Sequence, residues 1–227
     1  MPLQEVSYDA EPTQAQKDYF LDNYSDYLEN TAGIEALQTA VNGGDAIVFG
    51  AAVVELNAKV DRDHGFDHYV KQGAKLGAVL VEAYALVEST VSVDDGTHIG
   101  RQAEVYEEAS VGRNVVLCEM SAVTKSIVED DAVIGKNSIV EKDSRVSKNA
   151  RVGEKTYITS SVLEQDSSSG DDNELMEARL GAGAVVEGTN NLFVGVSIPE
   201  AATVSVSDKV ILAKDEPRKV YRTGELA

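Results

Sequence analysis

Aliphatic residues recur at every sixth position through the middle of this chain. A second register, four residues after each of them, holds Ala, Val, Ser or Thr at all but one position, Ile127. One five-residue step follows Val123, and the series then resumes. The aliphatic members are Val81, Val87, Val93, Ile99, Val105, Val111, Leu117, Val123, Val128, Ile134, Val140, Val146, Val152 and Ile158.

A period of six is compatible with strands and incompatible with one face of a helix. Six is an even number, so alternation along a strand keeps both registers on the same side. Six residues of helix turn through about 600°, which would scatter the same positions around the axis. The pattern therefore predicts short strands, each bent at a small residue, that wind into a solenoid with one aliphatic side chain per strand inside.

The repeat extends beyond this run in both directions. Downstream it restarts as Leu180, Val186, Leu192, Ile198, Val204 and Val210. The polar and acidic stretch 164–179 between the two runs predicts a loop that leaves the solenoid. Upstream, Val48, Val54 and Val60 form a weaker run, which suggests that the solenoid begins near Ala46 and is interrupted at 61–75.

The first 45 residues have a different pattern. Thr13 followed by Gln16 gives a helix N-cap signal, and Gly43–Gly44 gives a stop signal. We predict helices over about 13–30 and 33–42 that cap the open end of the solenoid. The expected organisation is a helical cap (1–45), a β-solenoid (46–210) and a tail (211–227).

The repeat resembles that of the hexapeptide-repeat family. Its motif appears as I-G-R-Q-A-E at 99–104, V-G-R-N-V-V at 111–116 and I-G-K-N-S-I at 134–139. The resemblance implies an all-β fold, the left-handed parallel β-helix, in which three hexads make one triangular coil. It also implies a homotrimer and an acyltransferase that uses acetyl-CoA to modify a hydroxyl or amine of a small molecule.

With three hexads to a coil, outward residues about 18 apart should stack in ladders. The first ladder would be Leu80, His98, Val116, Val133 and Arg151. The second would be Leu86, Glu104, Ala122, Ile139 and Tyr157, and the third Ser92, Ser110, Ile127, Arg145 and Leu163. The first two carry outward apolar residues, so we expect them to form the subunit contacts.

His98 is the candidate catalytic residue. It points outward in the first ladder, and acyltransferases of this family place active sites between subunits and often use a histidine as general base. Imidazole suits this role because it titrates near neutrality. The alternative is a histidine that only packs in the interface.

Two further resemblances concern ligands. His64 and His68 lie four apart among aspartates, and the family includes γ-class carbonic anhydrases with three histidine ligands. Their order differs here, and Arg101 stands where a ligand would, so a solvated acidic loop is favoured over zinc. The segment P-R-K-V-Y-R at 217–222 is similar to acyltransferase C-termini, which implies CoA contacts from Arg218, Lys219 and Arg222. The alternative is an ordinary basic tail.

Composition narrows the possible partners. The 227 residues carry 39 acidic and 20 basic side chains, a net charge of −19, which argues against binding to nucleic acid or to an anionic membrane. The single cysteine, Cys118, allows no internal disulfide. With no signal-peptide pattern at the N-terminus, we expect a cytoplasmic protein. The leading hypothesis is the acyltransferase; a non-catalytic scaffold and a carbonic-anhydrase relative are the alternatives.

Overall fold

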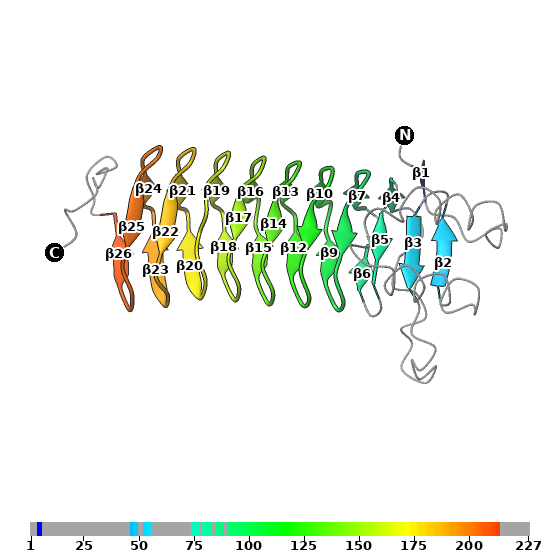
Figure 1. Cartoon of the computed structure of the whole chain (residues 1–227), viewed down its shortest axis with the longest axis horizontal. Coiled ribbons are helices and arrows are strands. Elements are labelled where there is room, and N and C mark those ends of the chain that lie inside the picture. Colours follow the sequence, from blue (N-terminus) through cyan, green and yellow to red (C-terminus); the bar gives the residue numbers. More distant parts are fainter. Residues whose placement is uncertain are drawn as a thin grey trace, which may run out of the picture.

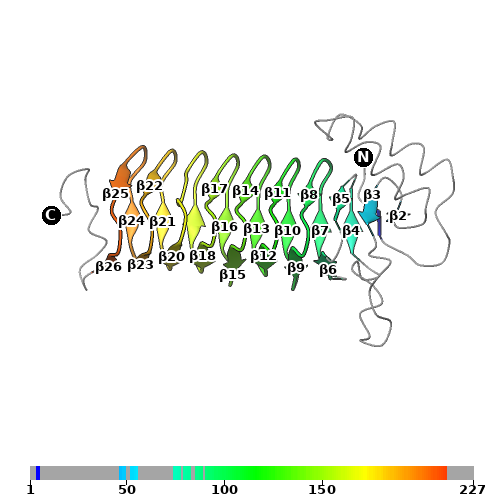
Figure 2. The same ribbon diagram turned by 60° about the horizontal axis from the view of Figure 1, so that its bottom comes forward.

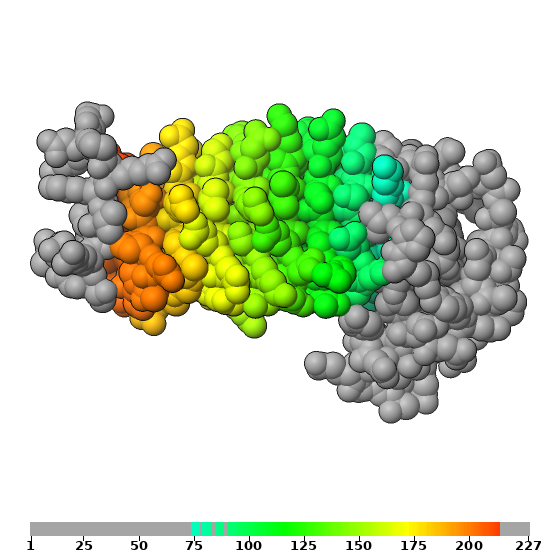
Figure 3. All heavy atoms as spheres, turned by 90° about the horizontal axis from the view of Figure 1, so that it is seen from above, coloured from blue at the N-terminus to red at the C-terminus, as the bar shows by residue number. Residues whose placement is uncertain are grey.

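The computed structural model describes residues 74–213, except 78, 83, 84 and 89, and the backbone of three short strands upstream, at 4–5, 46–49 and 52–55. These residues form a parallel β-solenoid whose coils are stacked in chain order (Figures 1 and 2). In the space-filling view, the coils from 74 onward form a rod of successive layers (Figure 3). The described residues contain no helix long and apolar enough to cross a membrane.

Each coil contributes one strand to each of three faces, here called sheets A, B and C. Sheet A contains β1 (Gln4–Glu5), β4 (Lys75–Leu76), β7 (Ser92–Val93), β10 (Ser110–Val111), β13 (Ile127–Val128), β16 (Arg145–Val146), β19 (Val162–Leu163), β21 (Arg179–Leu180) and β24 (Ser197–Ile198). Sheet B contains β2 (Ala46–Phe49), β3 (Ala52–Glu55), β5 (Leu80–Val81), β8 (His98–Ile99), β11 (Val116–Leu117), β14 (Val133–Ile134), β17 (Arg151–Val152), β22 (Val185–Glu187) and β25 (Thr203–Ser205), with Ser168 bridging β17 and β22. Sheet C contains β6 (Leu86–Val87), β9 (Glu104–Tyr106), β12 (Ala122–Thr124), β15 (Ile139–Glu141), β18 (Tyr157–Thr159), β20 (Asn173–Met176), β23 (Asn191–Val194) and β26 (Val210–Leu212).

The predicted core and the first two outward ladders are confirmed. All fourteen aliphatic positions from Val81 to Ile158 are at most 2% exposed. His98 pairs with Leu80 and Val116, and Ala122 pairs with Glu104 and Ile139. The third ladder ends at Val162 rather than at Leu163, because Val162 pairs with Arg145 while Leu163 points inward.

The corners between sheets A and B require left-handed backbone. One residue per coil has φ near +60° at this corner, and the side chains there include Asn114, Asp131, Asn149 and Asp166. Asn and Asp tolerate this conformation better than other non-glycine residues. They also bond along the stack, since the Asn114 amide donates to Asp131 at 3.1 Å and Asn149 to Asp166 at 3.0 Å.

Residues 164–179 do not leave the solenoid, contrary to the prediction. They form most of a regular coil in which Ser168 bridges Arg151 and Val185, and β20 pairs with β18 and β23. Three of the interior positions are polar here, Ser167, Ser169 and Asn173, which hid the repeat. Asn173 is 2% exposed, and its amide donates to the carbonyls of Ser169 (2.8 Å) and Gly188 (3.1 Å).

The last two inward positions of sheet C also differ from the prediction. Phe193 and Ile211 are buried, at 1% and 8% exposure, whereas Leu192 and Val210 point outward. The preceding corner is one residue longer, because Asn191 occupies the corner and bonds to Asn173 below it. One added residue moves the alternation to the opposite face.

The beginning of the solenoid is closed by antiparallel strands. β2 and β3 form a hairpin, and β3 joins β5 in parallel, so residues 46–55 do not make the regular parallel coil that the weak upstream repeat suggested. β1 adds to β4 antiparallel. The predicted helices at 13–30 and 33–42 and most of the predicted interruption at 61–75 lie outside the described residues.

Two stacked serines at the corner between sheets B and C give a direct test of this interior. Ser138 Oγ donates to the Gly153 carbonyl at 2.6 Å and accepts from the Thr156 N–H at 3.0 Å. Ser121 Oγ is buried and finds no partner. We expect Ser138→Ala to cost about 1 kcal/mol or more and Ser121→Ala to be neutral or stabilising. Urea unfolding measures both, and an equal loss in the two variants would contradict this assignment.

Candidate active site

His98 lies on β8, in the middle of the outward ladder of sheet B. Its side chain is 38% exposed, and Leu80 and Val116 flank it on the coils below and above. Its Nε2 lies 2.5 Å from Oε1 of Glu82, which follows β5 directly. The site is thus a half-exposed imidazole, bordered by aliphatic side chains and held by one carboxylate.

The Glu82 carboxylate fixes the orientation of the imidazole. Its second oxygen, Oε2, accepts the Arg101 backbone N–H at 2.8 Å, so both oxygens are engaged. The hydrogen bond with His98 lowers the pKa of Glu82, and this outweighs the opposing effect of burial. A carboxylate that remains ionised can only accept, so Nε2 carries a hydrogen and the neutral imidazole has its free lone pair on Nδ1.

The same carboxylate arrangement recurs in two other coils. Glu129 accepts from Arg145 and from the Lys148 N–H at 3.0 Å. Glu164 accepts from Arg179 and from the Ala182 N–H at 3.1 Å. The bridge is therefore a device of the fold that ties one coil to the next. On sheet B, His98 takes the place in the bridge that arginine takes in the two bridges on sheet A.

Glu82 is the partner of His98 that the sequence pattern did not predict. The signal was present in the repeat, because each of these glutamates directly follows an inward aliphatic residue. A basic side chain stands 15 or 16 positions later in all three cases. This sequence separation is two residues shorter than one coil. The basic side chain therefore lies on the neighbouring strand, diagonally across from the carboxylate.

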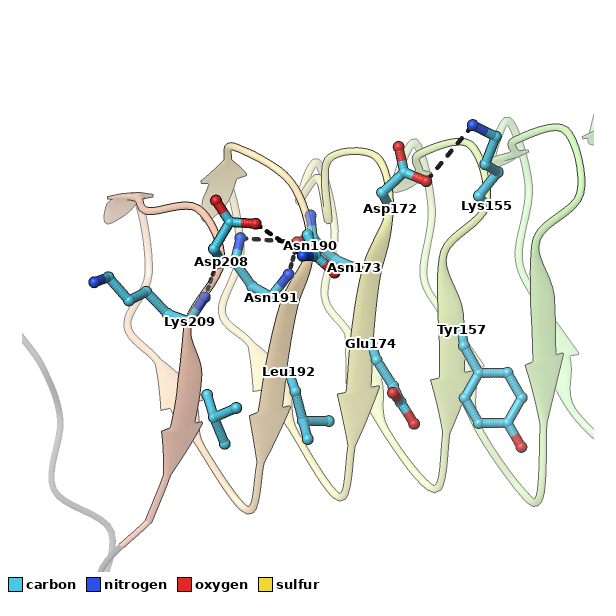
Figure 4. Close-up of a pocket in the computed structure, with 11 residues that line it drawn as sticks. Lys155, Tyr157, Asp172, Asn173, Glu174, Asn190, Asn191, Leu192, Asp208 and Lys209 are labelled. Atoms are coloured by element: carbon cyan, nitrogen blue, oxygen red, sulfur yellow. Dashed lines mark hydrogen bonds and ion pairs between the residues drawn. The ribbon is translucent and has the colours of Figure 1, made fainter.

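A cavity of the described surface lies elsewhere, on the C-terminal part of sheet C. Its volume is about 460 Å³. Tyr157, Glu174 and Leu192 extend outward from successive strands, with Asp172, Asn190 and Asp208 along the adjoining corner (Figure 4). A second cavity of about 310 Å³ lies over β10 and β13. His98 lines neither of them.

The other candidate residues fall largely outside the structure. His64 and His68, and Arg218, Lys219 and Arg222, lie outside the described residues. In the described part of the chain, no three His, Cys, Asp or Glu side chains cluster in a way that could hold a metal ion. Burial raises the pKa of the Cys118 thiol, which favours its protonated form.

Comparisons with known proteins add solved structures only, since no family model and no curated protein matches. Francisella novicida UDP-N-acetylglucosamine acyltransferase is 13% identical over 60% of this chain and 60% of its own, with a TM-score of 0.32. A mutant GDP-perosamine N-acetyltransferase from Caulobacter crescentus, in complex with CoA and GDP-perosamine, is 18% identical over 64% and 57%, with a TM-score of 0.29. UDP-N-acetylglucosamine acyltransferase from Campylobacter jejuni is 18% identical over 61% and 65%, with a TM-score of 0.29.

These alignments span less than two thirds of the neighbours' own lengths. At such identities and scores they say nothing about the chemistry of this chain. Its fold is defined by its own six-residue repeat and strand pairing, which make it a parallel β-solenoid.

Glu82 and Glu104 should affect stability in opposite directions. The pKa of Glu82 is below 4.5 in the folded chain, so its stabilisation is present above that pH and is lost as the pH falls through the folded value. Burial raises the pKa of Glu104 above 4.5, so its ionisation destabilises the fold at neutral pH, and this penalty disappears on acidification. Near pH 7 we expect Glu82→Gln to be less stable than the unsubstituted chain and Glu104→Gln slightly more stable. Both differences should shrink as the pH is lowered below 4.5 in urea unfolding, and changes of the same sign at pH 7 would contradict the assignment.

Proposed function

We propose that this protein is an acyltransferase in which His98 is the general base and Glu82 is its positioning residue. The observation that carries the proposal is the hydrogen-bonded pair itself: the carboxylate holds Nε2–H, which leaves Nδ1 as the lone-pair nitrogen of a half-exposed imidazole. Arginine, which fills this position in the other two bridges, could form the bridge but could not accept a proton.

The reaction follows from a base of this kind. Nδ1 would take the proton from an acceptor hydroxyl or amine as its oxygen or nitrogen attacks the thioester carbonyl of acetyl-CoA. The tetrahedral adduct then collapses, the carbon–sulfur bond breaks, and the imidazolium returns the proton to the CoA sulfur. Glu82 stabilises the transient positive charge without itself taking a proton.

The proposal includes a homotrimer with active sites between subunits. Leu80, Val116 and Val133 form a half-exposed aliphatic strip on either side of His98, and burial of this strip would exclude water from the imidazole. Arg218, Lys219 and Arg222 are the residues proposed to contact the phosphates of CoA, as cationic donors to anionic oxygens.

The test uses the full chain with acetyl-CoA and a panel of small amines and alcohols, including amino sugars. Release of free thiol that depends on the acceptor, stabilisation by CoA in a thermal melt, and a trimeric native mass are the expected results. No response to CoA at millimolar concentration, together with no thiol release for any acceptor, would overturn the proposal.

A non-catalytic scaffold is the second candidate, and one observation favours it. The Glu129–Arg145 and Glu164–Arg179 bridges show that the fold uses this contact for coil-to-coil attachment alone. Under that reading, His98 would be interchangeable with arginine. His98→Arg should then preserve both stability and biological activity, whereas a general base would be lost.

A further inference from the structure

The cavity on the C-terminal part of sheet C, here called the sheet C groove, has a partly apolar floor. It has a volume of about 460 Å³ and runs across β18, β20, β23 and β26. Tyr157, Leu192 and Val210 project outward along it, and Val210 is 66% exposed. Small-molecule sites usually combine such a floor with a few polar groups that fix the orientation of the ligand.

Carboxylates provide most of the open polar groups of this groove. Glu174 extends from β20, and among the described residues its side chain forms no ion pair or hydrogen bond (Figure 4). Asp172 Oδ1 lies 3.7 Å from Lys155 Nζ, and Asp208 Oδ1 accepts from the Asn190 amide at 2.8 Å. Each of these two aspartates therefore keeps its second oxygen available to a ligand.

The hydrogen-bond donors of the groove are largely used within the fold. The Asn173 amide donates to two backbone carbonyls, and the Asn191 amide donates to Asn173 Oδ1 and to a third carbonyl. The Tyr157 hydroxyl donates to Glu141. The groove thus presents mainly acceptors, so a complementary ligand must be rich in donors.

The open carboxylates are spread along the groove rather than gathered at one point. Asp172 and Asp208 occupy equivalent corners two coils apart, roughly 10 Å at the usual spacing of neighbouring strands. Within the described ranges, no group of three His, Cys, Asp or Glu side chains is placed to hold a metal ion. An elongated ligand with donors at separate points fits this spacing, and a single metal ion does not.

We infer that the sheet C groove binds a linear organic diamine or polyamine that lies along the solenoid axis. An ammonium group has three donors and no acceptor, so it matches Glu174 and Asp208 more closely than a hydroxyl, which also needs a donor. The methylene groups of the ligand pack on Leu192 and Val210. The ring of Tyr157 adds attraction for positive charge on its face.

The two lysines of the groove do not oppose this ligand. Lys155 is neutralised in part by Asp172, and Lys209 extends away from Glu174 and Leu192 (Figure 4). The net charge of −19 attracts organic cations to the whole surface, and the groove then selects those with an apolar body. Since the groove lies on sheet C and His98 on sheet B, the inference does not depend on the proposed acyl transfer.

Isothermal titration calorimetry of the full chain with spermidine, at constant ionic strength, tests the site. We expect saturable binding that Glu174→Gln and Asp208→Asn each weaken about 10-fold or more, because each removes the charge from an acceptor of an ammonium group. Glu200→Gln is the matched control. It removes the same charge from an exposed position between β24 and β25, outside the groove, and should bind as the unsubstituted chain does. Far-UV circular dichroism shows whether each variant is folded.

Several outcomes would overturn the inference. Binding that does not saturate, that Mg²⁺ at the same ionic strength abolishes, or that Glu200→Gln weakens equally would reduce the effect to screening of the net charge. Competition by the neutral polyol sorbitol would identify hydroxyls as the recognised groups. Binding lost in His98→Ala but retained in Glu174→Gln would assign the amine to the candidate active site on sheet B.

Discussion

Replacing Gly153 with alanine is expected to destabilise the protein by about 3 kcal/mol or more, which would be among the largest effects of any single methyl group in the solenoid. A Cβ at this position would lie 1.9 Å from the Gly170 carbonyl oxygen and 2.1 Å from its carbon. Both atoms belong to the backbone of the next coil, so no side-chain rotation relieves the clash. The coils would have to separate, which weakens the hydrogen bond from the Gly153 N–H to Ser169 Oγ.

Gly183→Ala is the matched control for this substitution. Gly183 has a φ of +65°, so alanine there is strained, but the nearest atom to its Cβ would be 3.9 Å away. We expect a loss of only about 1–2 kcal/mol, the cost of the left-handed backbone alone. Urea unfolding of both variants, followed by far-UV circular dichroism, measures the difference. Equal losses would mean that close approach of the coils does not limit the residue at 153.

The repeat predicted most of this architecture because the packing of a solenoid recurs at a fixed period along its sequence. Each coil contacts only its neighbours, so the same small set of positions must be aliphatic again and again. Val81 on β5 and Ile158 on β18 are thirteen strands apart along the chain, yet both point into the interior and both are fully buried. The outward ladder of His98 followed from the same periodicity.

The prediction failed where the interior is held by hydrogen bonds rather than by apolar burial. Asn173 and Asn191 stack through their side-chain amides, with Asn191 Nδ2 donating to Asn173 Oδ1 at 2.9 Å. A hydrophobic pattern cannot detect this stack, so 164–179 looked like a loop. The corner at Asn191 is one residue longer, which shifts the inward–outward alternation of side chains by one residue. Phe193 therefore points inward in place of the predicted Leu192.

The sequence predicted only one of the two residues of the candidate site, because the other is identified by a side-chain contact and not by the repeat. His98 could be selected because it is an outward histidine in a defined ladder. Its partner lies diagonally, on the neighbouring strand, and is separated by 16 residues rather than a whole coil. Only the side-chain geometry shows that Glu82 reaches it, and that Glu129 and Glu164 repeat the contact with arginine.

His98→Ala is expected to lower kcat for acyl transfer by about 10²–10⁴-fold while KM for acetyl-CoA changes little. The variant removes the one group at this site that can accept the acceptor proton. Glu82→Gln should also lower kcat, because its amide can donate to Nε2 and thereby move the imidazole hydrogen to Nδ1. Free imidazole added to the assay should restore part of the activity of His98→Ala and none of the activity of Glu82→Gln.

Arg145→Ala separates catalysis from attachment of the coils. It removes the equivalent bridge to Glu129 in another coil, so it should reproduce the structural consequence of losing a bridge while leaving acyl transfer unchanged. Activity lost equally in His98→Ala and Arg145→Ala, or imidazole that rescues neither, would reduce His98 to a coil-to-coil contact. The scaffold hypothesis would then stand, because the chemical difference that the proposal uses is that the imidazole of His98 can accept a proton on a ring nitrogen and the guanidinium groups of the other two bridges cannot.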